Sequence, residues 1–302
     1  MRIRRHAAGL TQQELADLAQ VSLGTVRDLE QGRTHRPCRG SMTRLAAVLG
    51  LDDARLQTLT RSTPEPARNG GRVRVCGLQL KVLGPVEAWR GGTPVGLGDA
   101  RQRAVLALLA LSPDVAVHRE TLIDALWHDN PPASAIHLLQ TYVSRLRRVL
   151  DPGRPPRDPG GLLVSAGTSY RLRVTGDALD LLAFGQLAGH ARAAAAAGEP
   201  GAACDAWERA LGLWRGEPVA DVDALRGHPA AVQVSRARTA AVLEYAELAG
   251  QAGREEPVLG HLAGLAAREP LNEKACARLM LTLAATGQQA AALQAYEDLR
   301  RR

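Results

Sequence analysis

The feature that most constrains the fold is a change of apolar period in the middle of the chain. The segment "LQLKVLGPVEAWRGGTPVGL" (78–97) has short alternating apolar runs with Gly91-Gly92 between two of them, which is typical of strands joined by a hairpin turn. From Asp99 to Asp151 apolar residues recur at helical spacing in three runs, and "LLVSAGTSYRLRV" (162–174) returns to two short β-type runs. A small sheet, three helices and a hairpin, in this order, predict a winged helix-turn-helix.

The third helical run combines an apolar stripe with a basic outer side. Its apolar residues recur at i, i+3, i+7, i+10 and i+14, and we expect these five to face the core: Ile136, Leu139, Val143, Leu146 and Leu150. No acidic residue occurs between Asp129 and Asp151, whereas a solvated surface helix normally mixes both charges. Arginines with short polar side chains suit a helix that lies in the DNA major groove. The alternative is an ordinary surface helix with a basic face in an arginine-rich chain.

Charge is unevenly distributed along the chain, whose net charge is +7. Residues 1–75 contain 13 basic and 7 acidic residues, residues 76–175 contain 12 and 8, and residues 176–302 contain 13 and 16. A polyanion would therefore be attracted to the first two thirds and weakly repelled by the last.

Cysteine spacing and hydropathy indicate the compartment. The four cysteines lie far apart, without the paired spacing of zinc sites or disulfide frameworks, so we expect no metal. No run of 18 apolar residues and no signal peptide occurs in the sequence. These observations predict a cytoplasmic protein that does not contact a membrane.

The N-terminal 60 residues carry a separate motif, and residues 61–77, rich in proline, glycine and charge, are expected to be a linker. Thr11 and Glu14 have the spacing of a capping box that starts a helix. A small core is expected from Leu15, Ala16, Val21, Val26 and Leu29, with "MTRLAAVLGL" as a packing helix.

The segment "GLTQQELADLAQVSLGTVRDLEQGR" (9–33) resembles the Cro/repressor-type (XRE-type) helix-turn-helix. The resemblance implies that Gln12 braces the DNA backbone and that the following residues face the major groove: Ser22, Leu23, Gly24, Thr25 and Arg27. Leu23 and Gly24 offer no hydrogen bonds to bases, so a degenerate motif retained for packing or dimerisation is the alternative.

Residues 176–302 are rich in alanine and leucine and show helical periodicity, with breaks at 196–201, 215–229, 251–257 and 285–289. Gly253 and Gly287 lie 34 residues apart at equivalent turns, which is the tetratricopeptide (TPR) period. The pattern predicts a stack of antiparallel helix pairs. The final "AYEDLRRR" stops within a helical pattern, so we expect the domain to continue beyond residue 302.

Several consecutive motifs carry a second resemblance. The segments "LGPVEAWRGGTPVGLGDARQRAVLALLAL", "LIDALWHDNPPASAIHLLQTYVSRLRRVLDP" and "GTSYRL" resemble the OmpR-type winged helix of the Streptomyces antibiotic regulatory protein (SARP) family. The segments "ALGLWRGEPVADV" and "EPLNEKACARLMLTLAATGQQAAALQAYEDLRR" resemble that family's bacterial transcriptional activator domain. The resemblance covers about residues 78–302 and implies a winged-helix domain over 78–175 and an activator domain over 176–302. Larger family members carry an ATPase module after this point.

The family's recognition helix falls on residues 134–150. By this resemblance, the residues expected to face DNA on that helix are Gln140, Thr141, Tyr142, Ser144, Arg145, Arg147 and Arg148. The wing contributes Thr168, Tyr170 and Arg171. Ala166 stands where related wings often place an arginine, which puts minor-groove readout by the wing in doubt.

Activation in this family implies binding to direct repeats near the −35 element, as a side-by-side dimer on DNA, and recruitment of RNA polymerase holoenzyme. The loop "WHDNPPASA" (127–135), with His128, Asp129 and Asn130, resembles the segment that faces polymerase, sigma region 4 in particular. Its simpler interpretation is a loop that starts a helix with Ser134 as N-cap, and both interpretations are compatible. The resemblance implies regulation of an antibiotic biosynthesis gene cluster.

Enzymatic activity finds little support in the sequence. Phosphate-loop, nucleophile-elbow and HExxH motifs are absent, so we expect no catalytic residues and no cofactor. The competing function is a helical-repeat adaptor that binds nucleic acid weakly. Altogether the sequence predicts a mainly α protein with small β-sheets: a helix-turn-helix domain, a winged helix-turn-helix domain and a TPR-like α-helical repeat domain.

Overall fold

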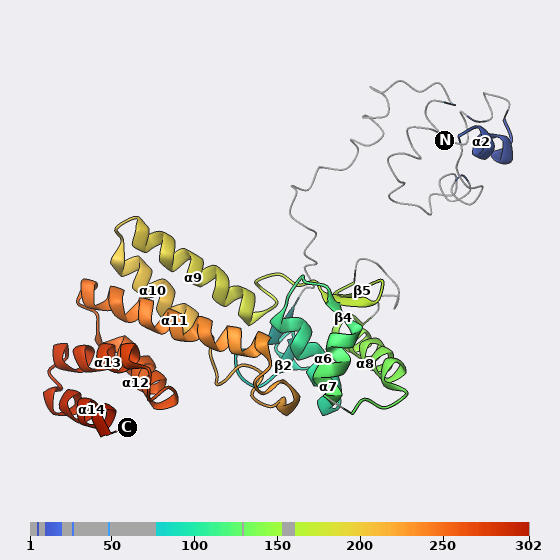
Figure 1. Cartoon of the computed structure of the whole chain (residues 1–302). Coiled ribbons are helices and arrows are strands. Elements are labelled where there is room, and N and C mark those ends of the chain that lie inside the picture. Colours follow the sequence, from blue (N-terminus) through green and yellow to red (C-terminus); the bar gives the residue numbers. More distant parts are fainter. Residues whose placement is uncertain are drawn as a thin grey trace. The chain divides into compact units, whose positions relative to one another are not determined.

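The fold was analysed in a computed structural model of the 302-residue chain (Figure 1). The structure describes residues 5, 10–19, 26, 48, 77–128, 130–152 and 161–301. The chain divides into two compact units, residues 1–70 and 71–302. The predicted fold class, mainly α with small sheets, is confirmed. No helix in the described ranges is long and apolar enough to cross a membrane.

In the first unit, helix α2 (Gln12–Leu18) begins at the predicted capping box. The Thr11 amide donates to Glu14 Oε2 at 2.7 Å, and the Glu14 amide donates to Thr11 Oγ1 at 3.2 Å. Hydrogen bonds to the Glu14 carboxylate, first from the Thr11 amide and then from the Thr11 side chain, lower the pKa of Glu14. Leu15, Ala16 and Val26 are fully buried together, as predicted. Val21 and Leu29 lie outside the described residues.

The second unit begins with the predicted winged helix. Its elements, in chain order, are β1 (Leu78–Lys81), β2 (Glu87–Arg90), β3 (Thr93–Pro94), α6 (Ala100–Leu111), β4 (Val117–His118), α7 (Arg119–Trp127), α8 (Ala135–Leu150), β5 (Leu163–Ala166) and β6 (Ser169–Leu172). Strands β1, β2 and β3 form one antiparallel sheet, and a second has the order β4-β6-β5. The expected order of a sheet, three helices and a hairpin is confirmed, with one further strand, β4, between α6 and α7.

The turns of this domain follow from local chemistry. Gly91 and Gly92 have φ values of +55° and +82°, which a glycine pair adopts at low cost in a tight hairpin. Asp99 starts α6, because its side chain accepts a hydrogen bond from the Gln102 amide at 2.8 Å. Gly167 (φ +61°) forms the turn of the second predicted hairpin.

The remaining residues form a helical block. Its helices are α9 (Asp180–Ala196), α10 (Pro200–Leu211), α11 (Pro229–Ala252), α12 (Leu259–Arg268), α13 (Glu273–Ala285) and α14 (Gln289–Arg301), with 3-10 turns at Asp223–Leu225 and Glu256–Val258. Gly253 and Gly287 lie at equivalent turns, as their spacing predicted, and both follow a helix with a positive φ. The break between α12 and α13 was not predicted; Asn272 starts α13 by accepting from the Ala275 amide.

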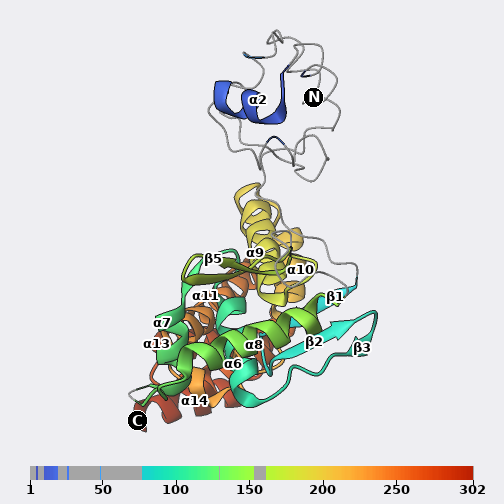
Figure 2. The ribbon, with the colours of Figure 1, turned by 90° about the vertical axis from the view of Figure 1, so that its right-hand side faces the viewer.

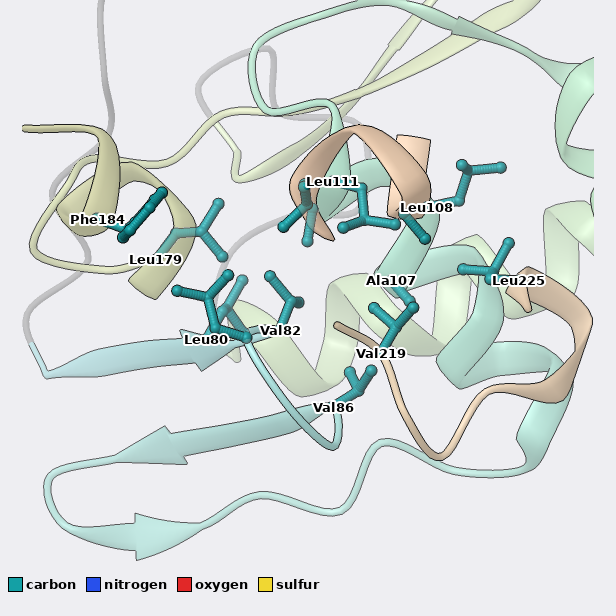
Figure 3. Packing of buried hydrophobic residues seen from close by; sticks show 14 of the residues in the cluster. Leu80, Val82, Val86, Ala107, Leu108, Leu111, Leu179, Phe184, Val219 and Leu225 are labelled. Carbon is teal, nitrogen blue, oxygen red and sulfur yellow. The ribbon is translucent and has the colours of Figure 1, made fainter. Parts of the chain in front are cut away.

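The winged helix and the helical block share one continuous core. Figure 3 shows Leu80, Val82 and Val86 of the first sheet region packed near Leu179 and Phe184 of the α9 region and Val219 of the loop that precedes α11. A backbone hydrogen bond also joins the two parts, since the Leu80 amide donates to the Ala178 carbonyl at 2.7 Å. The sequence did not predict this junction, because its residues come from segments 98 to 135 positions apart and have no shared period.

Candidate nucleic-acid interface

Helix α8 is held at its C-terminus and along its inner face, and it is seen lengthwise in Figure 2. Its apolar side packs against α6 and α7. At its C-terminus, Arg90 Nη2 of β2 donates to the carbonyls of Val149 and Leu150, both at 2.9 Å. A cation at this end also suits the partial negative charge of the helix terminus. The position of α8 is therefore fixed by the sheet as well as by the neighbouring helices.

Two sequence-based assignments on α8 were wrong. Ile136, predicted to be buried, is 44% exposed, whereas Tyr142, predicted to face the DNA backbone, is 7% exposed. The buried face of α8 consists of residues 135, 139, 142, 143, 146 and 150. The predicted apolar face began at Ile136, whereas the observed face begins at Ala135, and this rotation of the helix buries Tyr142 and exposes Ile136. Ser134 occupies the N-cap position as predicted, but its side chain makes no capping hydrogen bond.

The outer face of α8 is exposed and basic. The exposed side chains are His137, Gln140, Ser144, Arg145 and Arg148. Thr141 is half-buried and its hydroxyl donates to the His137 carbonyl at 2.9 Å, which leaves its oxygen to accept hydrogen bonds. Arg145 and Arg148 form no ion pair or hydrogen bond with any residue the structure describes. Two guanidinium groups are thus available to an external anion.

Arg147 has a different environment from its two neighbours. Its Nε donates to the Leu163 carbonyl and its Nη2 donates to Ser165 Oγ, both at 2.8 Å. Burial lowers the pKa of Arg147, although its guanidinium remains the charged form at neutral pH. Arg147 therefore ties α8 to strand β5, and any contact with DNA would use its remaining Nη1 group.

The wing is anchored to the start of α7. Thr168 is exposed at the turn, and its Oγ1 lies 2.8 Å from His118 Nε2. His118 in turn caps α7, because its Nδ1 accepts a hydrogen bond from the Glu120 amide at 3.4 Å. In the neutral tautomer in which Nδ1 accepts from the Glu120 amide, Nε2 carries the proton and donates to Thr168 Oγ1.

Tyr170 and Arg171 of the wing are half-buried, and the Arg171 Nε is buried without a hydrogen-bond partner among the residues that the structure describes. Ala166 is exposed beside the turn. Because the residues of the turn itself, 166–168, carry no charge, a cation of the wing can reach DNA only from the sides of the hairpin. This geometry agrees with the doubt that Ala166 raised about minor-groove readout.

The loop between α7 and α8 is exposed at His128 and Asn130, while Asp129 lies outside the described residues. His128 has φ +48°, and its amide donates to Asp124 O at 2.8 Å, which closes the end of α7. Beside the loop, the Arg101 guanidinium lies 5.6 Å from the centre of the Trp127 ring.

The N-terminal helix-turn-helix is described only in part. Gln12 is the first residue of α2 and is half-buried. The other residues expected to face DNA there lie outside the described residues: Ser22, Leu23, Gly24, Thr25 and Arg27.

Sequence reasoning missed the residues that position this interface. Arg90, His118 and Ser165 hold α8 and the wing through hydrogen bonds, but none of them stands out in a helical or alternating pattern. The one available signal was the isolated arginine at the end of a strand in "EAWRGG", and its partner, the end of α8, is 59 residues away.

Comparisons with known proteins agree with this architecture. Residues 92–172 match the family described as transcriptional regulatory protein, C terminal. Residues 179–302 match the bacterial transcriptional activator domain, and residues 1–59 match a helix-turn-helix domain family. A winged helix followed by an activator domain defines a class of bacterial transcriptional regulators.

Similar whole proteins identify the family. Regulatory protein DnrI of Streptomyces peucetius is 32% identical over 74% of this chain and 84% of its own length. Regulatory protein AfsR of Streptomyces coelicolor is 38% identical over 74% of this chain, which spans only 22% of that longer relative. The structure of Mycobacterium tuberculosis EmbR in complex with a low-affinity phosphopeptide is similar with a TM-score of 0.64 and 32% identity, over 74% of this chain and 58% of that chain. The chain belongs to the Streptomyces antibiotic regulatory protein family.

Proposed function

We propose that this protein is a sequence-specific DNA-binding activator whose helix α8 enters the major groove of promoter DNA. The observation that carries the proposal is the outer face of α8. There Arg145 and Arg148 are exposed and unpaired among the described residues, while the opposite side of the helix is buried. Guanidinium groups in this position neutralise phosphates or bind the O6 and N7 atoms of guanine.

Short side chains beside these arginines support a close approach of the helix backbone to the bases. Gln140 and Ser144 are exposed along the same face, and the hydroxyl oxygen of Thr141 is free to accept a hydrogen bond from a base. Arg147 and Thr168 act in this proposal mainly by holding the wing against α8 and α7. Tyr170 and Arg171, on the strand that follows the turn, contact the phosphate backbone.

We infer that the N-terminal helix-turn-helix adds a second DNA contact. Its support is the surplus of six positive charges in residues 1–75 and the helix-turn-helix family match over residues 1–59. Gln12 at the start of α2 has the position from which such motifs contact the DNA backbone.

The exposed loop between α7 and α8 is the proposed contact with RNA polymerase holoenzyme, sigma region 4 in particular, through His128, Asp129 and Asn130. In this proposal two copies bind side by side on direct repeats near a −35 element and activate a gene cluster for antibiotic biosynthesis. The support is membership of the family and the exposure of His128 and Asn130 beside the recognition helix.

The decisive experiment maps protection on the promoter region that flanks the gene, with and without polymerase holoenzyme, and then measures affinity for the protected fragment at several salt concentrations. Replacing Arg145 and Arg148 by glutamine should lower affinity at least tenfold. It should also reduce the slope of log K against log salt by about two, since each lost phosphate contact removes about 0.9. Arg209→Gln with Arg300→Gln, two exposed arginines of the helical block, is the control with the same net charge and should leave the slope unchanged.

Two outcomes would overturn the proposal. If the Arg145 and Arg148 variant keeps the affinity and salt slope of the original protein, α8 does not contact DNA. If the original protein protects no fragment and its weak binding hardly depends on salt, the helical-repeat adaptor is the better description. For the polymerase contact, His128→Ala with Asn130→Ala should keep DNA affinity and lose most of the activation of transcription in a purified system.

A further inference from the structure

A pocket of about 580 Å³ lies between the 217–227 loop and the first turns of α11. Its size falls in the range of sites that bind small molecules. We propose that this pocket is an effector site for a small amphipathic anion, a molecule with an apolar body and one carboxylate or similar group.

The lining of the pocket is apolar with charged side chains at the edge. The apolar lining consists of Pro218, Val219, Ala220, Val222, Leu225, Ala231 and Val232. Arg226, Ser235, Arg236, Glu217 and Glu269 supply the polar groups. The apolar part of a ligand therefore fits the interior of the pocket. The charge that the ligand should carry follows from which of the polar groups at the edge have no partner inside the protein.

Both carboxylates are already engaged inside the protein. Glu217 Oε1 lies 3.2 Å from Arg268 Nε. Glu269 accepts hydrogen bonds from Thr239 Oγ1 at 2.6 Å and from Asn272 Nδ2 at 2.7 Å, and the bond from Thr239 is the main cause of its lowered pKa. Neither carboxylate is thus available as a primary partner for a ligand cation.

The arginines at the edge are not equivalent. Arg226 Nη2 is paired with Asp223 Oδ1 at 2.6 Å. Arg236 is exposed and forms neither an ion pair nor a hydrogen bond within the described part of the chain. The unpaired charge at this pocket is therefore positive, and together with the Ser235 hydroxyl it suits an anionic group.

The loop that lines the pocket carries backbone strain. Val219 is buried and has φ +50°, a left-handed conformation that β-branched residues rarely adopt. Such a conformation persists only where the surroundings hold it, and here the Val219 amide donates to the Val82 carbonyl of the winged helix at 3.0 Å.

The same loop docks on the DNA-binding domain. The Ala220 amide donates to Gly84 O, and Asp221 accepts a hydrogen bond from the Val86 amide at 2.7 Å. In Figure 3, Val219 lies between Val86 and Ala107 of the winged helix. One side of the loop thus lines the pocket while the other contacts the winged helix, so a ligand that stabilises the loop also stabilises this docking.

The test uses the full chain and the probe 2-naphthoate, which has an apolar body and one carboxylate, with uncharged 2-naphthamide as its analogue. Calorimetric titration should show that naphthoate binds about tenfold more tightly than the amide, the size expected for one charge-assisted hydrogen bond. Arg236→Gln should remove this preference, whereas Arg209→Gln, an exposed arginine on α10, should retain it.

A second variant tests the location independently of charge. Val232→Trp fills the pocket from the half-buried first turn of α11 and should weaken binding of both probes at least tenfold, with an unchanged unfolding transition as evidence of folding. Binding of naphthoate that is equal to that of the amide, or insensitive to both variants, would overturn the proposed site.

Hydrogen exchange tests the regulatory part without DNA, so its result is distinguishable from any failure of the proposed DNA binding. Saturating naphthoate should slow exchange of the Val86 and Val219 amides at least threefold and leave the Leu172 amide of the wing unchanged. Unchanged exchange at Val86 and Val219 in the saturated protein would show that the pocket is not coupled to the winged helix.

Discussion

The outer face of α8 and the junction between the winged helix and the helical block both contain arginines, but they use them in opposite ways. On α8, Arg145 and Arg148 have no partner among the described residues. At the junction, Arg215 Nη1 lies 2.8 Å from Glu87 Oε1, and its Nη2 donates to the Pro85 carbonyl at 3.0 Å. Arg103 pairs with Asp221 at 3.1 Å.

Whether an arginine has a partner inside the protein distinguishes a binding residue from a structural one better than the net charge of its region does. An arginine that is already paired inside the protein stabilises the fold, and a ligand must compete with its partners. An exposed arginine without a partner contributes little to stability, and its charge is available to a ligand without competition from another residue. Stability measurements on matched variants should therefore distinguish the two regions.

The largest effect is expected for Asp180→Ala at the junction. The Asp180 carboxylate is 8% exposed and accepts hydrogen bonds from the Val82 and Leu83 amides at 2.9 to 3.0 Å. Removing it leaves two buried donors unpaired, so we expect a loss of about 3 kcal/mol in the free energy of unfolding by urea. Asp177→Ala, an exposed aspartate three residues earlier, is the control and should change it by less than about 0.5 kcal/mol.

Gly84→Ala should have the next largest effect. Gly84 has φ +150°, and a Cβ placed there would lie 2.9 Å from Arg215 Cβ. We expect a loss of about 2 kcal/mol in urea unfolding. Gly185→Ala, in the exposed middle of α9 where nothing lies within 4 Å, should instead stabilise by about 0.5 to 1 kcal/mol. Equal effects at both glycines would contradict the tight contact at the junction.

Two neighbouring arginines of α8 test the comparison within a single helix. Arg147→Gln breaks both hydrogen bonds to strand β5 and should cost about 1 to 2 kcal/mol of unfolding free energy. Arg148→Gln, one residue further and exposed, should leave the thermal midpoint unchanged within error. A destabilised Arg148 variant would mean that the outer face of α8 contributes to the fold.

The smallest expected effect is a pH dependence. Burial raises the pKa of Asp180, against the opposing hydrogen bonds from Val82 and Leu83 and the charge of Arg215. The folded protein therefore binds this proton more tightly than the unfolded chain. The contribution of Asp180 to stability is then largest below about pH 4 and declines as pH rises through the raised pKa. As pH rises from below about 4 through the raised pKa, the free energy of unfolding by urea should fall in the original protein relative to the Asp180→Asn variant. A rise in this difference with pH would contradict the direction of the pKa shift.

Local pattern predicted the local structure well. The glycine pair 91–92, the capping box of Thr11 and Glu14, and the turns at Gly253 and Gly287 were all expected, because each depends on residues a few positions apart. The three helices of the winged helix followed from apolar period for the same reason.

Apart from the break between α12 and α13, which depends on the local cap of Asn272, the main failures concern contacts that are distant in the sequence. The apolar spacing of α8 is compatible with a buried face that begins at either Ala135 or Ile136. Packing against α6 and α7 decides that Tyr142 is buried and Ile136 is exposed. The pairing of Arg90 with the end of α8, and of Arg147 with the wing, cannot be read from spacing. Of the proposed interface, the helix and its face were predictable, whereas the residues that fix its position were not.

The shared core at the junction decides where the winged helix could be separated from the rest of the chain and joined to another protein. A module cut after residue 175 would lose the acceptors of the Val82, Leu83 and Val86 amides and the apolar partners Leu179 and Val219. A portable unit would have to retain the segment through Asp221, so chimeric regulators of this kind should be joined beyond that residue.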